Sequence, residues 1–291
     1  MQEKLPNEQA FSVTDEHRAR WNVLDMITVI AKGTVPTYMF MDIDMTWAEG
    51  LRGQFKDLGR KITVTAILLK AIGIAQRSHP ASRTAALPFG KRAILNNIVA
   101  GFTVERFVGS QPAVFFGAIE APDTKPLELI SEELKGYGTA EMKDVDHLAT
   151  QHWFNYMPWL FRQAVLWFGQ RFPSVRLRHM GATFGLSSLG KFGIKALIPP
   201  CASTSTFGIG EVEYRPVVRD GKVEVRPMMT ITLNFDHRMI DGAPAARFMQ
   251  DIRQLMEGGL ESHVAESLVK KDKDQKLPAP ASQLSSTYSK A

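Results

Sequence analysis

The sequence predicts an α/β protein in which helices and strands alternate around a sheet. Segments with the 3.6-residue period of a helix alternate with runs of strand formers, and no internal repeat interrupts them. The 291 residues are 44% hydrophobic, which allows one large domain or two small ones. No run of about 18 uncharged apolar residues occurs, so the pattern predicts no membrane-spanning helix.

The first half of the chain combines helix stop signals with strand-forming runs. Gly33 and Pro36 end the first helical segment, Pro80 closes the second, and Gly136 stops the third. In order, the predicted elements are a helix over residues 21–36, a strand over 37–46, a helix over 65–78, strands over 93–105 and 112–120, and a helix over 125–136.

The second half predicts a β-hairpin. Two strand patterns over residues 211–235 meet at Asp220-Gly221, a dipeptide that tolerates the positive φ angles of a tight turn. In the second strand, Ile231, Leu233 and Phe235 point to one face and small polar residues point to the other. This alternation predicts a half-buried strand.

The charge of the chain and its cysteine content indicate which binding partners and which cellular compartment to expect. The formal net charge is +5, and both signs are mixed along the chain, which favours acidic partners only slightly. A single cysteine, Cys201, excludes an internal disulfide and a cysteine-based zinc cluster, and it fits a reducing cytoplasm. The polar N-terminus lacks the apolar core of a secretory signal, so we expect a cytoplasmic protein.

Polar residues stand where the hairpin's second strand meets a predicted helix. Asp236-His237-Arg238 end the strand, and Asp241-Gly242 precede Pro244, which fits a first helical turn. The apolar face of that helix consists of Ala245, Phe248, Met249, Ile252 and Leu255. Such a corner can hold His237 and Asp241 close together. An imidazole fixed by a second group can take a proton from a thiol or hydroxyl at neutral pH, although the spacing alone also fits a histidine that caps a helix or stays solvated.

The wider context of this corner is more specific. The stretch "DHRMIDGAPAARFMQDIRQLME" resembles the signature of the catalytic domain of the 2-oxoacid dehydrogenase (dihydrolipoamide) acyltransferases, a pattern close to D-H-R-x-x-D-G-A-x-x-A-x-F before an apolar helix. Upstream, "GATFGLSSLGKFGIKALIPP" is similar to the family's G-G-T-F-T-I-S-N-L-G-x-x-G segment. Looser matches extend the resemblance over about residues 20–260, apart from one insertion. It implies the mixed-sheet, two-layer α/β sandwich of chloramphenicol acetyltransferase, assembled as trimers.

The resemblance also implies roles for individual residues. His237 would be the general base that deprotonates the acyl acceptor or the thiol of coenzyme A, and Ser187 would donate a hydrogen bond to the tetrahedral oxyanion. Asp241 would hold the active-site loop, by pairing with a basic residue. Ser188 is the second choice for the serine role, because only one of two adjacent side chains faces a pocket in an extended segment. For Asp236 and Arg238 we expect a structural ion pair.

The same resemblance implies the reaction and its partners. The chain would transfer an acyl group between coenzyme A and a thiol of the lipoyl type or another small acceptor, with the histidine from one subunit and the serine from its neighbour. The printed chain carries neither a lipoyl domain nor a subunit-binding domain, so we expect a stand-alone enzyme that depends on a lipoyl-carrying protein or uses another acceptor. Its polar C-terminus favours an isolated trimer. The expected organisation is an N-terminal arm over residues 1–19, a catalytic domain over 20–262, and a disordered polar tail over 263–291.

An aromatic and arginine-rich insertion at about residues 150–178 departs from the family pattern. Its helical spacing and lack of acids fit a helical hairpin on the domain, an acyl-chain pocket, a subunit interface, or peripheral contact with an anionic membrane through residues 153–178. Its four arginines are Arg162, Arg171, Arg176 and Arg178.

Two other classes of function remain as alternatives. A catalytically silent trimeric scaffold would keep the fold and use the insertion to bind a membrane or a partner protein. A metal hydrolase would use His237 with Asp236 and Asp241, but the other histidines have no partner at zinc-ligand spacing, so we expect no metal. Nucleic-acid binding is not expected, and we assign no role to Cys201.

Overall fold

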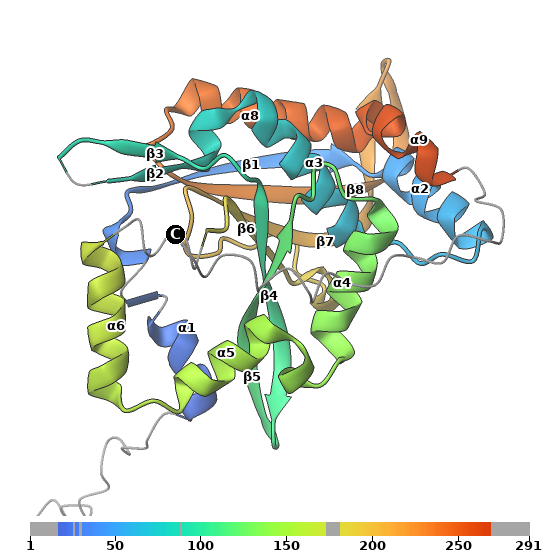
Figure 1. The fold of residues 1–291 in the computed structure, drawn as a ribbon. Helices are drawn as coiled ribbons and strands as arrows, with labels where there is room; N and C mark the ends of the chain where they lie inside the picture. The colour runs from blue at the N-terminus through green and yellow to red at the C-terminus, as the bar shows by residue number, and fades with distance from the viewer. Residues whose placement is uncertain (1–16, 26, 29–30, 88, 173–180, 269–291) are drawn as a thin grey trace, which may run out of the picture.

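The computed structural model describes residues 17–268 except 26, 29–30, 88 and 173–180. A six-stranded sheet with the order β1-β8-β7-β6-β4-β5 runs through the molecule (Figure 1). Strand β6 is parallel to both β4 and β7, and the other neighbours are antiparallel. The predicted α/β class with a mixed sheet is therefore confirmed.

The bounds of the elements are as follows. The strands are β1 (Pro36–Asp44), β2 (Thr84–Ala86), β3 (Arg92–Ile94), β4 (Val99–Val108), β5 (Gln111–Glu120), β6 (Phe184–Ser188), β7 (Ser205–Arg219) and β8 (Lys222–Asp236). The α-helices are α1 (Trp21–Asp25), α2 (Thr46–Asp57), α3 (Val64–Ser78), α4 (Leu127–Thr139), α5 (Asp146–Asn155), α6 (Trp159–Arg171), α8 (Gly242–Gln254) and α9 (Glu261–Leu268).

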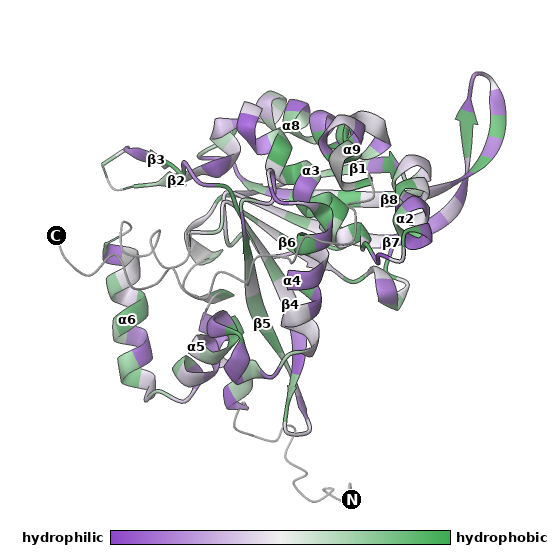
Figure 2. Ribbon diagram, turned by 45° about the vertical axis from the view of Figure 1, so that its right-hand side comes forward, coloured by the Kyte–Doolittle hydropathy of each residue, from purple (hydrophilic) through white to green (hydrophobic). Residues whose placement is uncertain are grey.

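The core lies between one face of the sheet and the helices α2, α3, α8 and α9, which gather on the same side in both views (Figures 1 and 2). Strand β8 contributes Ile231, Leu233 and Phe235 to it, all fully buried. Helix α8 contributes four of the five predicted apolar positions, Ala245, Phe248, Met249 and Ile252, while Leu255 is half-buried. Burial of each large side chain contributes about 1.5–3 kcal/mol, so this interface fixes the strand end that carries His237.

The polar face of β8 is also buried, contrary to the half-buried strand predicted from its alternation. The loop that includes residues 194–200 crosses this face and offers backbone carbonyls to it. The Thr232 hydroxyl donates to Leu197 O, and the Asn234 amide donates to Pro199 O at 2.8 Å. The small polar side chains of β8 thus lie where the backbone of a distant loop packs against the strand. The alternation of residues along a strand cannot predict such a long-range contact.

Strand β5 lies at the edge of the sheet. Side chains form hydrogen bonds with the backbone N–H and C=O groups on its unpaired side. Gln151 of α5 accepts from Phe116 N at 2.9 Å and donates to Phe116 O at 2.6 Å. Asn22 of α1 donates to Val114 O at 3.2 Å, and the Tyr137 hydroxyl bonds both backbone groups of Ala118. These bonds attach α1 and α5 to the sheet and block further strand pairing at this edge.

Several local predictions are confirmed. The hairpin turn forms at Asp220 and Gly221, with φ angles of 49° and 76°, as a two-residue turn with positive φ requires. Helix α3 begins after Thr63, whose side chain accepts from Ala66 N, and it ends before Pro80.

Other boundaries were wrong. The helix predicted over residues 21–36 is a short α1 followed, beyond a gap in the described residues, by a 3₁₀ turn over Ala31–Gly33. The strand predicted over 93–105 breaks at a bend around Asn96 and Asn97, which separates β3 from β4. Helix α2 was not predicted, because the run of strand-forming residues over 37–46 extends into its first residue.

The predicted terminal segments lie mostly outside the described residues, namely 1–16 of the arm and 269–291 of the tail. The tail boundary at residue 263 was placed too early, because α9 continues to Leu268 and buries Val264. No helix among the described residues is long and apolar enough to cross a membrane.

The loop over residues 194–200 packs so closely on β7 that a side chain at Gly208 should destabilise the protein. A Cβ added there would meet Leu197 O at 2.0 Å and the Thr232 hydroxyl at 2.7 Å. We expect Gly208→Ala to lower the free energy of unfolding by about 3 kcal/mol, measured by urea denaturation.

The matched control is Gly50→Ala in α2, where an added Cβ meets nothing within 4 Å. This variant should raise the free energy of unfolding by about 0.5–1 kcal/mol, because alanine restricts the unfolded chain and favours the helix. Equal effects at both glycines would contradict the packing of the loop on the sheet.

Candidate active site

His237 lies directly beyond the last residue of β8. The register of β8 with β1 ends with Asp236 opposite Pro36, and the His237 N–H donates to Val35 O at 2.8 Å. The backbone then turns back, because the N–H groups of Met239 and Ile240 both donate to Asp236 O. A rigid strand end therefore sets the position of the histidine.

The Asp236 carboxylate anchors this turn. It accepts from Val35 N at 3.3 Å and from Arg238 N at 3.1 Å, and it forms a bidentate pair with the Arg238 guanidinium at 2.9 and 2.5 Å. Burial alone would raise the pKa of Asp236, but these hydrogen bonds outweigh it and the net pKa is lowered. The expected structural ion pair is thus present.

His237 and Asp241 lie near each other, as the spacing predicts. The distance from His237 Nδ1 to Asp241 Oδ1 is 3.9 Å, beyond hydrogen-bond range, and the two side chains are 45% and 85% exposed. Asp241 occupies the N-cap position of α8, where its carbonyl accepts from Ala245 N at 3.0 Å. Among the described residues no Lys or Arg lies within 4.0 Å of its carboxylate, so the expected pairing with a basic residue is limited here to the imidazole.

Ser187 lies on β6, in the middle of the sheet. Its side chain is half-buried, and its hydroxyl lies 3.2 Å from the Thr103 hydroxyl on β4. Ser188 is exposed. The Thr103 contact could not be predicted from sequence, because it depends on the parallel pairing of strands far apart in the chain.

Ser187 and His237 are distant from each other within one chain. Ser187 lies opposite Gly208 of β7, and Gly208 lies opposite Thr232 of β8. From Thr232 to His237 the chain advances five residues at about 3.3 Å each, and two strand spacings add about 10 Å sideways. The separation is therefore on the order of 20 Å, too far for one reacting carbon to contact both residues.

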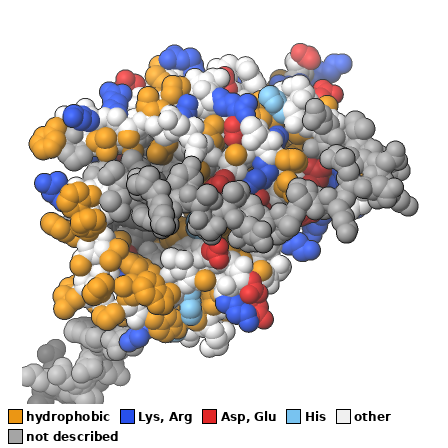
Figure 3. Space-filling model, in the orientation of Figure 1, with side chains coloured by type: hydrophobic (Ala, Val, Ile, Leu, Met, Phe, Trp, Pro, Cys, Tyr) orange, Lys and Arg blue, Asp and Glu red, His pale blue; other side chains and the backbone are white. Residues whose placement is uncertain are grey.

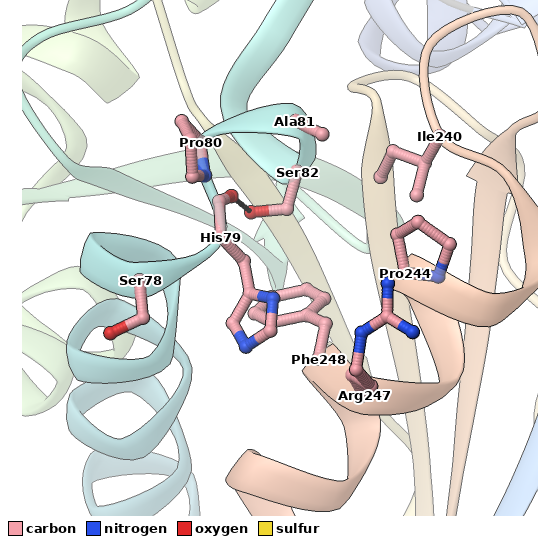
Figure 4. Close-up of a pocket in the computed structure, with 9 residues that line it drawn as sticks. All are labelled: Ser78, His79, Pro80, Ala81, Ser82, Ile240, Pro244, Arg247 and Phe248. Carbon is pink, nitrogen blue, oxygen red and sulfur yellow. Dashed lines mark hydrogen bonds between the residues drawn. The ribbon is translucent and has the colours of Figure 1, made fainter.

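Two cavities border the corner that carries His237. One, of about 300 Å³, lies between the end of α3 and the start of α8. Figure 4 shows His79, Arg247 and Phe248 lining it; the His79 ring bonds Asp251 through Nε2 at 2.7 Å. The other, of about 430 Å³, is lined by Pro36, Pro199, Cys201, Asn234 and neighbours. Among the described residues lining them, neither His237 nor Ser187 is present.

Cys201 is not a candidate nucleophile. Its side chain is buried, and burial, assisted by the nearby Asp236 carboxylate, raises its pKa to about 12. The thiol is therefore protonated at neutral pH, and the reactive thiolate is absent.

The described residues contain no group of three or more His, Cys, Asp or Glu side chains that could hold a metal ion.

Comparison with known proteins supports the resemblance seen in the sequence. Residues 176–263 match the family model described as 2-oxoacid dehydrogenases acyltransferase (catalytic domain). The chain is 29% identical over 236 residues, 78% of its length, to the dihydrolipoyllysine-residue acetyltransferase component of the pyruvate dehydrogenase complex of Zymomonas mobilis. Over 81 residues, 26% of its length and 20% of that protein's, it is 42% identical to the succinyltransferase component of the 2-oxoglutarate dehydrogenase complex of Rickettsia conorii.

Solved structures with the same fold are also similar. Azotobacter vinelandii dihydrolipoamide acetyltransferase matches with a TM-score of 0.68 and 21% identity, over 89% of this chain and 97% of that one. The cubic core of the pyruvate dehydrogenase multienzyme complex matches with a TM-score of 0.65 and 22% identity, over 89% and 97%. These likenesses support the fold. The chain spans 46% of the length of the Zymomonas relative, about half.

The Asp236 anchor predicts a pH-dependent effect on stability. A carboxylate whose pKa is lowered by folding stabilises the protein above its unfolded pKa of about 4, and the contribution is lost as the pH falls through the folded value. We expect Asp236→Asn to cost about 2–3 kcal/mol at pH 7, with a difference from the native protein that shrinks below about pH 4.

Urea denaturation between pH 7 and pH 3 measures this difference. Asp42→Asn is the control, because the Asp42 carboxylate is 54% exposed and its pair with Arg215 should contribute less than about 1 kcal/mol. A cost for Asp236→Asn that stays constant with pH would contradict the anchor.

Proposed function

We propose that the chain is a coenzyme A-dependent acyltransferase, on the premise that its residues 176–263 match the catalytic-domain model of the 2-oxoacid dehydrogenases acyltransferase family. The observation that carries the proposal is the rigid corner at the end of β8, where His237 stands half-exposed on a backbone fixed by Asp236. This corner lies inside the matched region.

The proposed reaction moves an acyl group between two thiols. His237 takes the proton from the attacking thiol, and the resulting thiolate adds to the thioester carbonyl. Ser187 donates a hydrogen bond to the oxyanion of the tetrahedral intermediate, with Thr103 next to it to orient the hydroxyl. When the carbon–sulfur bond of the leaving thiol breaks, its sulfur recovers the proton from His237. The same residues serve both directions.

The separation of the two residues supports a site formed by two chains. Because His237 and Ser187 of one chain are separated by a distance on the order of 20 Å, one acyl carbon cannot contact both of them. We therefore propose a homotrimer in which the histidine of one chain faces the serine of the next. Solved relatives with this fold include the cubic core of a pyruvate dehydrogenase complex.

A relative supports the choice of residues. The study of the Azotobacter vinelandii enzyme concerns a serine, a histidine and an asparagine in its catalytic mechanism. The histidine and asparagine are four positions apart, as are His237 and Asp241, and the serine precedes the histidine by about fifty positions in both chains. Asp241 would place a carboxylate where that enzyme has an amide, and we assign it the role of orienting His237.

The charge near Ser187 fits an anionic thioester such as an acyl-coenzyme A. From His147 to Gly210 the sequence contains no acidic residue. Lys191 follows the serine on a 3₁₀ turn and has no acidic partner among the described residues. The proposed acceptor is a lipoyl-type thiol on a carrier protein or another small thiol. Peripheral membrane contact through residues 153–178 is compatible with this chemistry but not required by it.

Formation of free coenzyme A from short- to long-chain acyl-coenzyme A donors, with free dihydrolipoamide as acceptor, tests the reaction; it is followed by chromatography, because one acceptor thiol is consumed for each coenzyme A thiol released. We expect His237→Ala to lower kcat by about 10²–10⁴, through loss of proton transfer, and Ser187→Ala by about 10²–10³, through loss of the oxyanion bond. Ser188→Ala is the control and should retain native turnover. Loss at Ser188 in place of Ser187 would reverse the serine assignment, and no turnover with any donor would favour the silent scaffold.

A mixing experiment tests the two-chain site. His237→Ala and Ser187→Ala chains are co-expressed with different tags, and the assemblies that carry both tags are isolated. Each mixed trimer contains one interface with an intact His237 and an intact Ser187, so about a third of native activity should return. If mixed trimers are as inactive as the single variants, the two residues do not meet across an interface.

A further inference from the structure

Helix α6 turns its apolar face away from the protein. Leu160 is 75% exposed, Phe161 63% and Trp167 64%, and Phe168 is also exposed. At 100° per residue these side chains fall on one arc of the helix. Trp159 at the start of α6 and Trp153 on α5 extend the surface. We call these six residues the aromatic face. Figure 3 shows hydrophobic side chains gathered in this part of the molecule.

The inward side of α6 is held by a polar anchor. Arg162 is buried and pairs with Asp25 of α1, with its Nε and Nη2 atoms 3.0 and 2.5 Å from Asp25 Oδ2. Its guanidinium also lies 4.3 Å from the centre of the Trp21 ring. Gln163 donates to Asp25 at 3.2 Å. The helix thus inverts the usual arrangement, because its charged residue is buried and its aromatic residues are exposed.

The charge around the aromatic face is positive. Arg171 lies on the exposed arc of α6, and Arg18 lies 5.9 Å from the Tyr156 ring beside α5. Neither has an acidic partner among the described residues, and no acid occurs in the sequence from His147 to Gly210. A two-fold contact between copies would oppose Arg171 to Arg171 with no acid to compensate, whereas the cyclic trimer proposed above would set this face against a different surface, an outcome that the test below distinguishes. Lipid phosphates supply the missing negative charge.

The dimensions of α6 fit a helix that lies in the plane of a membrane. Its 13 residues span about 20 Å, less than the roughly 30 Å of a bilayer's hydrocarbon core. Exposed tryptophans favour the boundary between headgroups and acyl chains. We infer that the aromatic face, with Arg171, docks the protein on the surface of a membrane that contains anionic lipids. Arg176 and Arg178, part of the predicted basic insertion, lie outside the described residues and are not needed for this inference.

Vesicle flotation with the full chain tests this inference. Vesicles of phosphatidylcholine alone are compared with vesicles that contain about 30% phosphatidylglycerol. We expect binding to the anionic vesicles, weaker binding to the neutral ones, and weakening by added salt. The Leu160→Glu/Phe168→Glu double variant should bind at least about tenfold less, and Arg171→Glu should lose the preference for phosphatidylglycerol.

The matched control introduces the same charges elsewhere. Val223 and Val225 of the β7–β8 hairpin are 72% and 69% exposed, so Val223→Glu/Val225→Glu should bind as the native protein does. Quenching of the native protein's tryptophan fluorescence by brominated lipids gives a readout that needs no variant. Failure of the native protein to bind or to be quenched overturns the inference. So does a Leu160→Glu/Phe168→Glu protein that still binds vesicles, or one whose assembly breaks apart, since the face would then be a contact between copies.

Discussion

The buried carboxylate of Asp236 is the constraint on which the rest of the site depends. It joins the end of β8 to two segments, because it accepts from Val35 N before β1 and from both the backbone and the guanidinium of Arg238 after β8. A charge in this position is tolerated only because nearly every acceptor site on it is used. The cost of breaking these bonds fixes the direction in which the chain leaves β8. His237 is therefore half-exposed and still has a defined backbone position, as the general base proposed here requires.

The sheet imposes a second constraint, because it fixes the distance between His237 and Ser187 and so bears on the proposed trimer. Strand register is rigid, since a shift by one residue would move Ile231, Leu233 and Phe235 out of the core. The distance between His237 and Ser187 therefore cannot be closed by a small motion within one chain. A second chain is the simple way to bring a serine to this histidine. The cavities beside the corner agree with that view, because their described linings include neither residue.

The features that sequence predicted are local ones. The Asp220-Gly221 turn, the end of α3 before Pro80, and the apolar face of α8 each depend on residues within a few positions of one another. The pairing of Ser187 with Thr103, the carbonyls over Thr232 and the Gln151 bonds to β5 depend on contacts between distant segments, for which a single sequence carries no signal. The candidate residues His237, Asp241 and Ser187 came from the family resemblance, since spacing alone left a solvated histidine open. What the structure adds is their geometry, including the distance that separates them.

The anchor of α6 shows how a protein can keep apolar surface free for a partner. If the helix were held by its aromatic residues, those side chains would be buried and unable to bind anything else. Here the attachment is a charge pair, Arg162 with Asp25, strengthened by the Trp21 ring and protected from water. In low dielectric such a pair is lost only at high cost once formed, because either partner alone would be a buried charge. The ion pair on the inward side of α6 therefore holds the helix in place, and the aromatic side chains on its outward side remain free to bind a partner.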